Sequence, residues 1–128
     1  SRGRRKGKRS GKIDYLSRHG DVVDALYSWR NSNLLPKGGR LVKNVLIDMG
    51  VEVADELVEV FEVKTSITRS DVYKAIGQLM VHGASDECRR VLVLPKNEHL
   101  TSDLKDALER LNIELLRFKL DEKAATIV

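Results

Sequence analysis

The sequence of 128 residues has one cysteine, two prolines, 5% aromatic residues and no long apolar run. Cys88 has no second cysteine with which to form a disulfide, which favours a reducing compartment such as the cytoplasm and a role for Cys88 as a small buried hydrophobe. No apolar stretch approaches the roughly 20 residues that a membrane-spanning helix requires, and no signal-peptide pattern is present. The length suits one domain, and the sequence predicts no membrane partner.

Negative charge is absent from the first twelve residues, SRGRRKGKRSGK. Their seven basic residues are Arg2, Arg4, Arg5, Lys6, Lys8, Arg9 and Lys12. Of 23 basic residues in the chain, 16 then remain against 19 acidic ones, so the overall charge of +4 comes from this arm. Residues 1–12 are expected to form a flexible arm or linker that binds DNA, because contacts to phosphates release counterions. A solubilising linker or a receptor-read address is the alternative.

From residue 13 onward the sequence predicts one α/β domain over residues 13–120 and a C-terminal tail over 121–128. The expected elements are a helix from about residue 17 or 20 to 31, strands within 40–65, a helix from Ser70 to Gly83, a strand from Val91 to Pro95, a helix starting at Thr101 or Ser102, and a last strand from Ile113 to Leu120. Helical or alternating spacing of apolar residues supports these assignments. The VLVLP strand is apolar on both faces, which is typical of parallel pairing.

Two carboxylates are predicted to meet in the strand hairpin of residues 45–64. A three-residue loop at Ala54-Asp55-Glu56 places Asp48 directly opposite Glu62, with Cβ atoms roughly 5 Å apart. Because side chains alternate, one face is expected to carry Leu46, Asp48, Gly50, Glu52, Val58, Val60, Glu62 and Lys64. The other face is expected to carry Ile47, Met49, Val51, Val53, Leu57, Phe61 and Val63, with Glu59 as its only charged member. Glu62 and Lys64 would therefore point to the same side as a second carboxylate.

Such an acid pair needs a shared proton or a cation, because two close carboxylates repel each other. Oxygen ligands favour Mg²⁺ or Mn²⁺. A lysine beside them would position a water molecule or stabilise charge that develops on phosphorus. The alternative interpretation is a half-exposed strand on which Glu62 and Lys64 form a surface pair worth about 0–1 kcal/mol.

The wider pattern resembles the PD-(D/E)xK nuclease superfamily. Asp48 is followed fourteen residues later by Glu62-Val63-Lys64 at the end of a hydrophobic strand, and then by a helix that carries Gln78. This superfamily has the restriction-endonuclease-like fold and includes Holliday-junction resolvases and RecB-type nucleases. The resemblance implies a mixed sheet flanked by helices in the order α-β-β-β-α-β, here with an added C-terminal α-β. It also implies that Asp48, Glu62 and the backbone carbonyl of Val63 bind Mg²⁺ or Mn²⁺, and that Lys64 and Gln78 complete the catalytic set.

The sequence departs from the family pattern at the first acid, which Ile47 precedes where proline is usual. Asp55 is a rival first acid, but its spacing to the E-x-K glutamate puts it in the turn. Many relatives carry a further acid on the first helix, and Asp21 is chosen over Asp24 as a metal ligand because it lies nearer the helix start. His19 could also reach the site, although a solvated residue at a helix start is the favoured interpretation.

Two further groups of residues have alternative interpretations. The loop of Thr65, Ser66, Thr68, Arg69 and Ser70 precedes a helix, where free N–H groups suit a phosphate. Capping and turn chemistry explains these residues equally well. Trp29 and Tyr73 are expected in the core or at its rim rather than as platforms for base stacking.

The resemblance implies a Mg²⁺-dependent DNA endonuclease, such as the catalytic domain of a restriction- or repair-type enzyme. A catalytically silent, DNA-binding domain with the nuclease fold is the alternative, and an unrelated α/β interaction domain is a third. Cutting both strands usually takes two sites, which favours a homodimer. Further domains or subunits are expected to supply specificity, and the start at Ser1 rather than Met leaves room for them.

Overall fold

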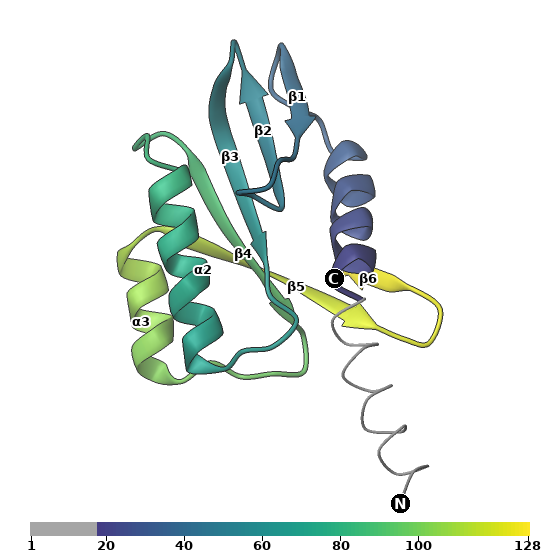
Figure 1. The fold of residues 1–128 in the computed structure, drawn as a ribbon, viewed down its shortest axis with the longest axis vertical. Coiled ribbons are helices and arrows are strands. Elements are labelled where there is room, and N and C mark those ends of the chain that lie inside the picture. Colours follow the sequence, from purple (N-terminus) through teal and green to yellow (C-terminus); the bar gives the residue numbers. More distant parts are fainter. Residues whose placement is uncertain (1–17) are drawn as a thin grey trace, which may run out of the picture.

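The computed structural model describes residues 18–128, and its elements follow the predicted order (Figure 1). The first helix is described over residues 18–31. The other elements are β1 (Gly39–Val42), β2 (Met49–Val53), β3 (Glu56–Val63), α2 (Arg69–His82), β4 (Arg89–Pro95), α3 (Ser102–Arg110), β5 (Ile113–Leu120) and β6 (Ala125–Ile127). The α/β class is therefore confirmed. The predicted basic arm lies outside the described residues.

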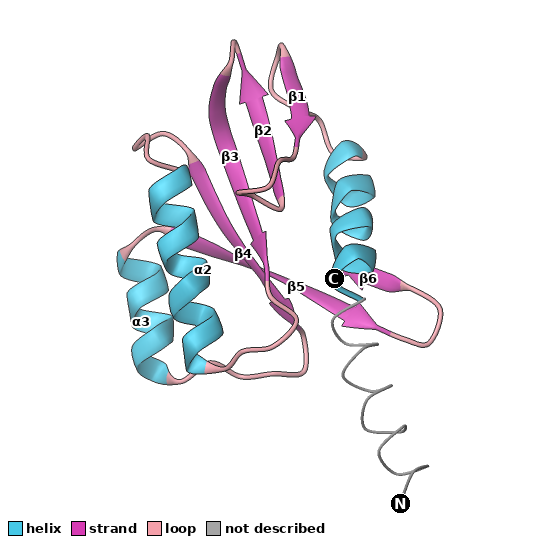
Figure 2. Cartoon of the chain, in the orientation of Figure 1, coloured by secondary structure: helices cyan, strands magenta, loops and turns pink. Residues whose placement is uncertain are grey.

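The six strands form one mixed sheet in the order β1-β2-β3-β4-β5-β6. The β1–β2–β3 meander is antiparallel, β3, β4 and β5 are parallel, and β6 returns antiparallel to β5. The predicted parallel pairing of the VLVLP strand is thus confirmed. Because β3, β4 and β5 run the same way, their carboxyl ends share one edge of the sheet (Figure 2).

The sheet separates two apolar clusters, and helices cover both of its faces (Figure 1). Val22, Val23 and Leu26 of the first helix pack with Phe61 on one face. On the other face, α2 and α3 cover a cluster that includes Val60. Successive residues of β3 therefore serve opposite cores, as the alternation of a strand requires. Cys88 is buried in the second cluster, as predicted.

The predicted hairpin register is correct from Met49 to Val51 and wrong nearer the turn. Met49 pairs with Phe61 as expected, but a β-bulge follows Val51 and shifts the register by one residue. The turn therefore has two residues, Ala54 and Asp55, both with positive φ, instead of three. Because a bulge exchanges the two faces of a strand, Leu57 packs with the α2 cluster and not with Phe61.

β2 begins at Met49 because the segment before it forms a turn. The side chain of Asn44 accepts hydrogen bonds from the backbone N–H groups of Leu46 and Ile47 at 2.7 and 3.1 Å. An asparagine that binds the following backbone in this way competes with strand pairing. Strand alternation consequently does not extend through Ile47, whose side chain packs in the α2 cluster and not on the face of Met49 where it was predicted.

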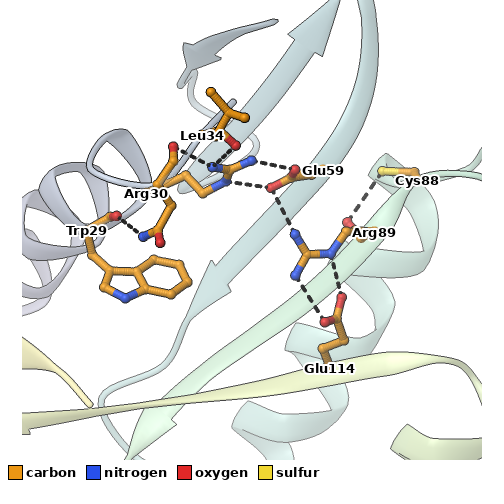
Figure 3. Close-up of polar contacts among 8 residues, drawn as sticks. Trp29, Arg30, Leu34, Glu59, Cys88, Arg89 and Glu114 are labelled. Atoms are coloured by element: carbon orange, nitrogen blue, oxygen red, sulfur yellow. Dashed lines mark hydrogen bonds and ion pairs between the residues drawn. The ribbon is translucent and has the colours of Figure 1, made fainter. Parts of the chain in front are cut away.

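A buried ion-pair network fastens the first helix to the sheet (Figure 3). Arg30 donates two hydrogen bonds of 2.8 Å to the carboxylate of Glu59 on β3, and both side chains are buried. Arg89 of β4 lies 3.5 Å from Glu59 and also binds Glu114 of β5 at 2.8 Å. The one charged residue predicted on an apolar face is thus explained by an arginine that the sequence analysis did not single out.

Two boundaries differ from those predicted. Residues 125–127 form strand β6 against β5, so the end of the chain is not a simple tail. Helix α2 begins at Arg69, and its N-cap is Thr68, whose hydroxyl accepts a hydrogen bond from the N–H of Asp71. Helix α2 therefore begins one residue before the predicted start at Ser70. Among residues 18–128 no helix has the length and apolar character to cross a membrane.

Candidate functional site

The structure brings Asp48 and Glu62 together where β2 begins and β3 ends. Glu62 is the penultimate residue of β3, and Asp48 immediately precedes β2. The two carboxyl groups lie close enough for the charge of Asp48 to raise the pKa of Glu62. Asp48 Oδ2 also accepts a hydrogen bond of 2.7 Å from the backbone N–H of Val63. This contact takes the place of the ladder bond that Val63 would make if β2 continued.

The two carboxyl groups differ in their affinity for a proton. Burial, followed by the nearby charge of Asp48, raises the pKa of Glu62 to about 8, and Lys64 opposes this shift. Burial also acts to raise the pKa of Asp48, but hydrogen bonds from His19 and the Val63 N–H outweigh it and hold this pKa below its usual value. At neutral pH the pair therefore retains one proton, carried mainly by Glu62.

His19 is the residue of the first helix that reaches this pair. Its Nε2 lies 3.3 Å from Asp48 Oδ2, and its side chain is 40% exposed. The hydrogen bond to Asp48 raises the pKa of His19. The structure thus places His19 at the site, although a solvated position was the favoured prediction. The signal in the sequence was its location at the start of a helix whose apolar face packs on β3.

The backbone carbonyl of Val63 faces the same side as its N–H group. Lys64, directly after β3, donates its N–H to Val93 of β4, so the neighbouring residue Val63 directs its polar backbone groups toward β2. The register would pair Val63 with Ile47, but the N–H of Ile47 donates to Asn44. Among the described residues, β2 offers the Val63 carbonyl no ladder partner, but the Val63 backbone contacts His19 and adds to the rise in the pKa of that imidazole.

Lys64 borders the carboxylates, and Gln78 lies on the neighbouring helix α2. Lys64 Nζ lies 3.7 Å from Glu62 Oε1, and its side chain is 20% exposed. A Cβ atom built on Gly83 would meet Val60 at 2.8 Å, which fixes the height of α2 along β3. Gln78 lies on α2, which packs against β3, and its side-chain carbonyl makes no hydrogen bond to the described residues around Glu62.

Gln78 has one unsatisfied polar atom. Its Oε1 is buried and has no hydrogen-bond partner among the described residues. Buried polar atoms are seldom left unpaired. Gln78 therefore retains the capacity to bind a further group between α2 and the end of β3.

Other candidate acids lie away from the pair. Asp21 accepts a hydrogen bond of 2.7 Å from Arg18 and is 55% exposed, and no contact joins it to Asp48. Asp24 is exposed. Asp55 is 97% exposed in the β2–β3 turn, which agrees with the choice of Asp48 as the first acid. The structure therefore brings His19, rather than Asp21, from the first helix to the site.

The hydroxyl-rich loop before α2 is occupied by a carboxylate of the same chain. The hydroxyls of Ser66 and Thr68 donate to Asp71, and the N–H of Asp71 donates back to Thr68. These hydrogen bonds lower the pKa of Asp71. An anion already fills this helix N-terminus, which favours the capping interpretation over a phosphate site.

The aromatic candidates are divided between core and surface. Trp29 packs against the cluster under the first helix, as predicted for a core or rim residue. Tyr73 is 55% exposed on α2, with the guanidinium of Arg69 5.6 Å from its ring centre. Arg69 itself forms an ion pair of 2.7 Å with Asp103 of α3. Tyr73 therefore lies on the surface of α2 and not in the core.

The donor set of the pair fits a hard cation that retains water ligands. Among residues 18–128 no group of three or more His, Cys, Asp or Glu side chains has the arrangement of a metal site. Mg²⁺ commonly binds through only one or two carboxylates and keeps several waters. Both polar contacts of Asp48 to His19 and Val63 go to Oδ2, which leaves Oδ1 for Glu62 or a cation. The Val63 carbonyl adds a third oxygen.

No protein-family model, curated protein or solved structure matches this chain. The likeness to the PD-(D/E)xK superfamily therefore depends on the residues and geometry described above.

Proposed function

We propose that the chain is a Mg²⁺-dependent DNA endonuclease of the PD-(D/E)xK type. One observation carries the proposal: Asp48, Glu62 and Lys64 meet at the end of β3, with a buried carboxyl whose pKa is raised to about 8 by its surroundings. A buried acid that faces a second carboxyl group is costly for a fold, and groups with such shifted pKa values gather at functional sites. A cation that displaces the shared proton would remove the repulsion between the carboxylates.

Each residue of the site has a role in this reaction. Asp48, Glu62 and the Val63 carbonyl would hold Mg²⁺, which supplies Lewis-acid stabilisation of the phosphoryl oxygens when bound. Lys64 orients the attacking water and offsets negative charge that develops on phosphorus. Gln78 of α2 would direct its buried, unpaired carbonyl oxygen to the water or substrate.

Three lysines lie at the sheet edge next to this site, with Glu98 among them. Lys64 follows β3, Lys96 follows β4, and Lys119 is the penultimate residue of β5. Because these three strands are parallel, their carboxyl ends share one edge. Lys96 and Lys119 also line a surface cavity of about 500 Å³. A row of cations here would follow the phosphate backbone of DNA, in addition to the basic residues of the arm.

The test is cleavage of supercoiled plasmid in Mg²⁺, Mn²⁺ or EDTA. Wild-type protein should nick the plasmid only with a divalent cation, and Lys64→Ala and Asp48→Asn should each lower the rate by at least about 100-fold, since each removes charge stabilisation in the transition state. Lys105→Ala is the matched control, because Lys105 is exposed on α3. Cleavage that survives both site substitutions would refute the proposal.

A silent DNA-binding domain is the second candidate, and one observation favours it. Within residues 18–128, the first helix brings to Asp48 the imidazole of His19 and not a further carboxylate that would complete a three-ligand metal site. DNA binding without cleavage in any metal would support this candidate. Removal of residues 1–12 should weaken binding and flatten its salt dependence in either case, if the arm contacts phosphates.

A further inference from the structure

Two apolar side chains project into solvent beside the carboxylates, on the loop between β1 and β2. Val45 is 100% exposed and Leu46 is 58% exposed. Leu46 precedes Asp48 by only two residues. Apolar surface left in water forgoes about 25 cal/mol per Å² of stabilisation, so neither side chain contributes fully to folding. Single exposed apolar residues are common, but an adjacent pair next to a candidate active site is a distinct surface feature.

The loop holds these side chains in a defined position. Asn44 accepts hydrogen bonds from the N–H groups of Leu46 and Ile47, and the Ile47 side chain is buried in the core. On the other side of the tip, Lys43 Nζ lies 5.7 Å from the ring centre of Tyr27. The loop is thus anchored on both sides of Val45. A preformed projection loses little conformational freedom when it binds a partner.

We propose that Val45 and Leu46 form a wedge that contacts unstacked bases of DNA bound at the carboxylate site. This inference rests on the proposed function. Leu46 lies within about 7 Å of Asp48 along the chain, which corresponds to about two base steps of one strand. The only charged residue between Arg40 and Asp48 is Lys43, whose sign suits a polyanion. The apolar part of DNA is the face of its bases.

The wedge identifies a class of substrate. Apolar side chains inserted at a base step unstack the bases at a free-energy cost, and this cost is smallest where a base is already unpaired. DNA with a bulged or unpaired base near the scissile phosphate should therefore bind better than a perfect duplex. A second copy of this chain is the other occupant that an apolar pair could accept, and its binding would contradict the wedge.

The experiment compares a perfect duplex with the same duplex that contains one bulged base, each labelled with 2-aminopurine next to the bulge position. The protein carries Lys64→Ala so that binding is measured without cleavage. The wedge variant adds Val45→Ser and Leu46→Ser. The control adds Leu34→Ser instead. Leu34 is 97% exposed, like the wedge residues, but it precedes the start of β1, whereas the wedge follows the end of β1. Val45, Leu46 and Leu34 are all exposed, so each added substitution should leave the fold intact, and thermal unfolding of every variant checks this.

The parent and the Leu34→Ser control should bind the bulged duplex at least about tenfold more tightly and increase its 2-aminopurine fluorescence. The wedge variant should bind both duplexes within about twofold. Three results would overturn the inference. The parent could bind both duplexes equally, or the wedge variant could lose the same affinity for both duplexes. The wedge variant could also change from dimer to monomer while it still prefers the bulged duplex. Bulge-selective binding without plasmid cleavage by the wild type would refute only the nuclease proposal, and cleavage without bulge preference would refute only the wedge.

Discussion

Strand β3 carries two buried glutamates, Glu59 and Glu62, and each is only 5% exposed. They point to opposite faces of the sheet. Glu59 receives two hydrogen bonds from Arg30 and a further contact from Arg89 (Figure 3). Glu62 has a lysine at 3.7 Å and a second carboxyl group beside it. Two glutamates of equal exposure thus differ in their surroundings. The charge of Glu59 is neutralised by arginine, whereas Glu62 is repelled by the carboxyl group of Asp48.

The comparison shows that partners, and not burial, separate a structural acid from a candidate reactive one. A buried carboxylate with a bidentate arginine has its charge and its oxygens satisfied by the fold. Glu62 has a single lysine at 3.7 Å against the charges of two carboxyl groups, so a proton or a further cation is needed to neutralise the pair. Substitution of each glutamate by glutamine removes the charge with little change in shape, and should give opposite results.

Glu59→Gln should give the largest loss of stability. The substitution leaves the buried guanidinium of Arg30 without its counter-charge, which typically costs about 3–5 kcal/mol in the free energy of unfolding. We expect the lower end of this range, because the amide oxygen still accepts one hydrogen bond. Urea denaturation at pH 7 measures the loss.

A double replacement tests the cause of that loss. Arg30→Leu combined with Glu59→Leu removes both charges together, and should bring the free energy of unfolding to within about 1 kcal/mol of wild type or above it. A double variant as unstable as Glu59→Gln would show that the ion pair itself, and not the unpaired charge, carries the stability.

Glu62→Gln should instead stabilise the protein in EDTA at alkaline pH. The pKa of Glu62 is raised from its ordinary value to about 8 by burial and by Asp48. The folded state therefore retains a proton that the unfolded state releases at lower pH. The contribution of Glu62 to stability is greatest below its unfolded pKa and is lost as pH rises toward 8. Glutamine cannot ionise, so the variant does not lose this contribution.

The measurement is urea denaturation of wild type and Glu62→Gln at pH 5, 7 and 9. The advantage of the variant should be smallest at pH 5 and grow through pH 7 to pH 9. Added Mg²⁺ should then stabilise the wild type more than the variant, if the cation binds the ionised pair. A difference between the two proteins that does not change with pH would contradict the raised pKa.

The sequence predicted the elements that depend on periodicity and the contacts that depend on register. The first helix, the parallel VLVLP strand and the meeting of Asp48 with Glu62 all follow from spacing along the chain. One extra residue shifts every strand pair that follows it. The predicted register is therefore correct near Asp48 and wrong between the bulge after Val51 and the turn. Alternation alone does not reveal where an extra residue enters a strand.

Contacts between elements distant in the chain were less accessible to sequence reasoning. Glu59 was recognised as an exception on an apolar face, but its partner Arg30 lies 29 residues away on the first helix. His19 and Asp21 are both near the start of that helix, and only the packing of the helix on the sheet decides which one faces Asp48. Which of the two residues faces Asp48 depends on the rotation of the helix about its axis. The few apolar residues of this helix define that rotation only approximately.

Arg89→Ala should give the smallest effect and shows how far the network of Glu59 extends. Arg89 lies 3.5 Å from Glu59, but its own side chain is 51% exposed, as is that of its partner Glu114. Exposed ion pairs are screened by water and contribute about 0–1 kcal/mol. We therefore expect Arg89→Ala to lower the free energy of unfolding by no more than about 1 kcal/mol in urea denaturation at low salt. A loss as large as that of Glu59→Gln would mean that Arg30 alone does not neutralise Glu59. In that case the difference between the two glutamates would depend on three strands and a helix instead of one buried pair.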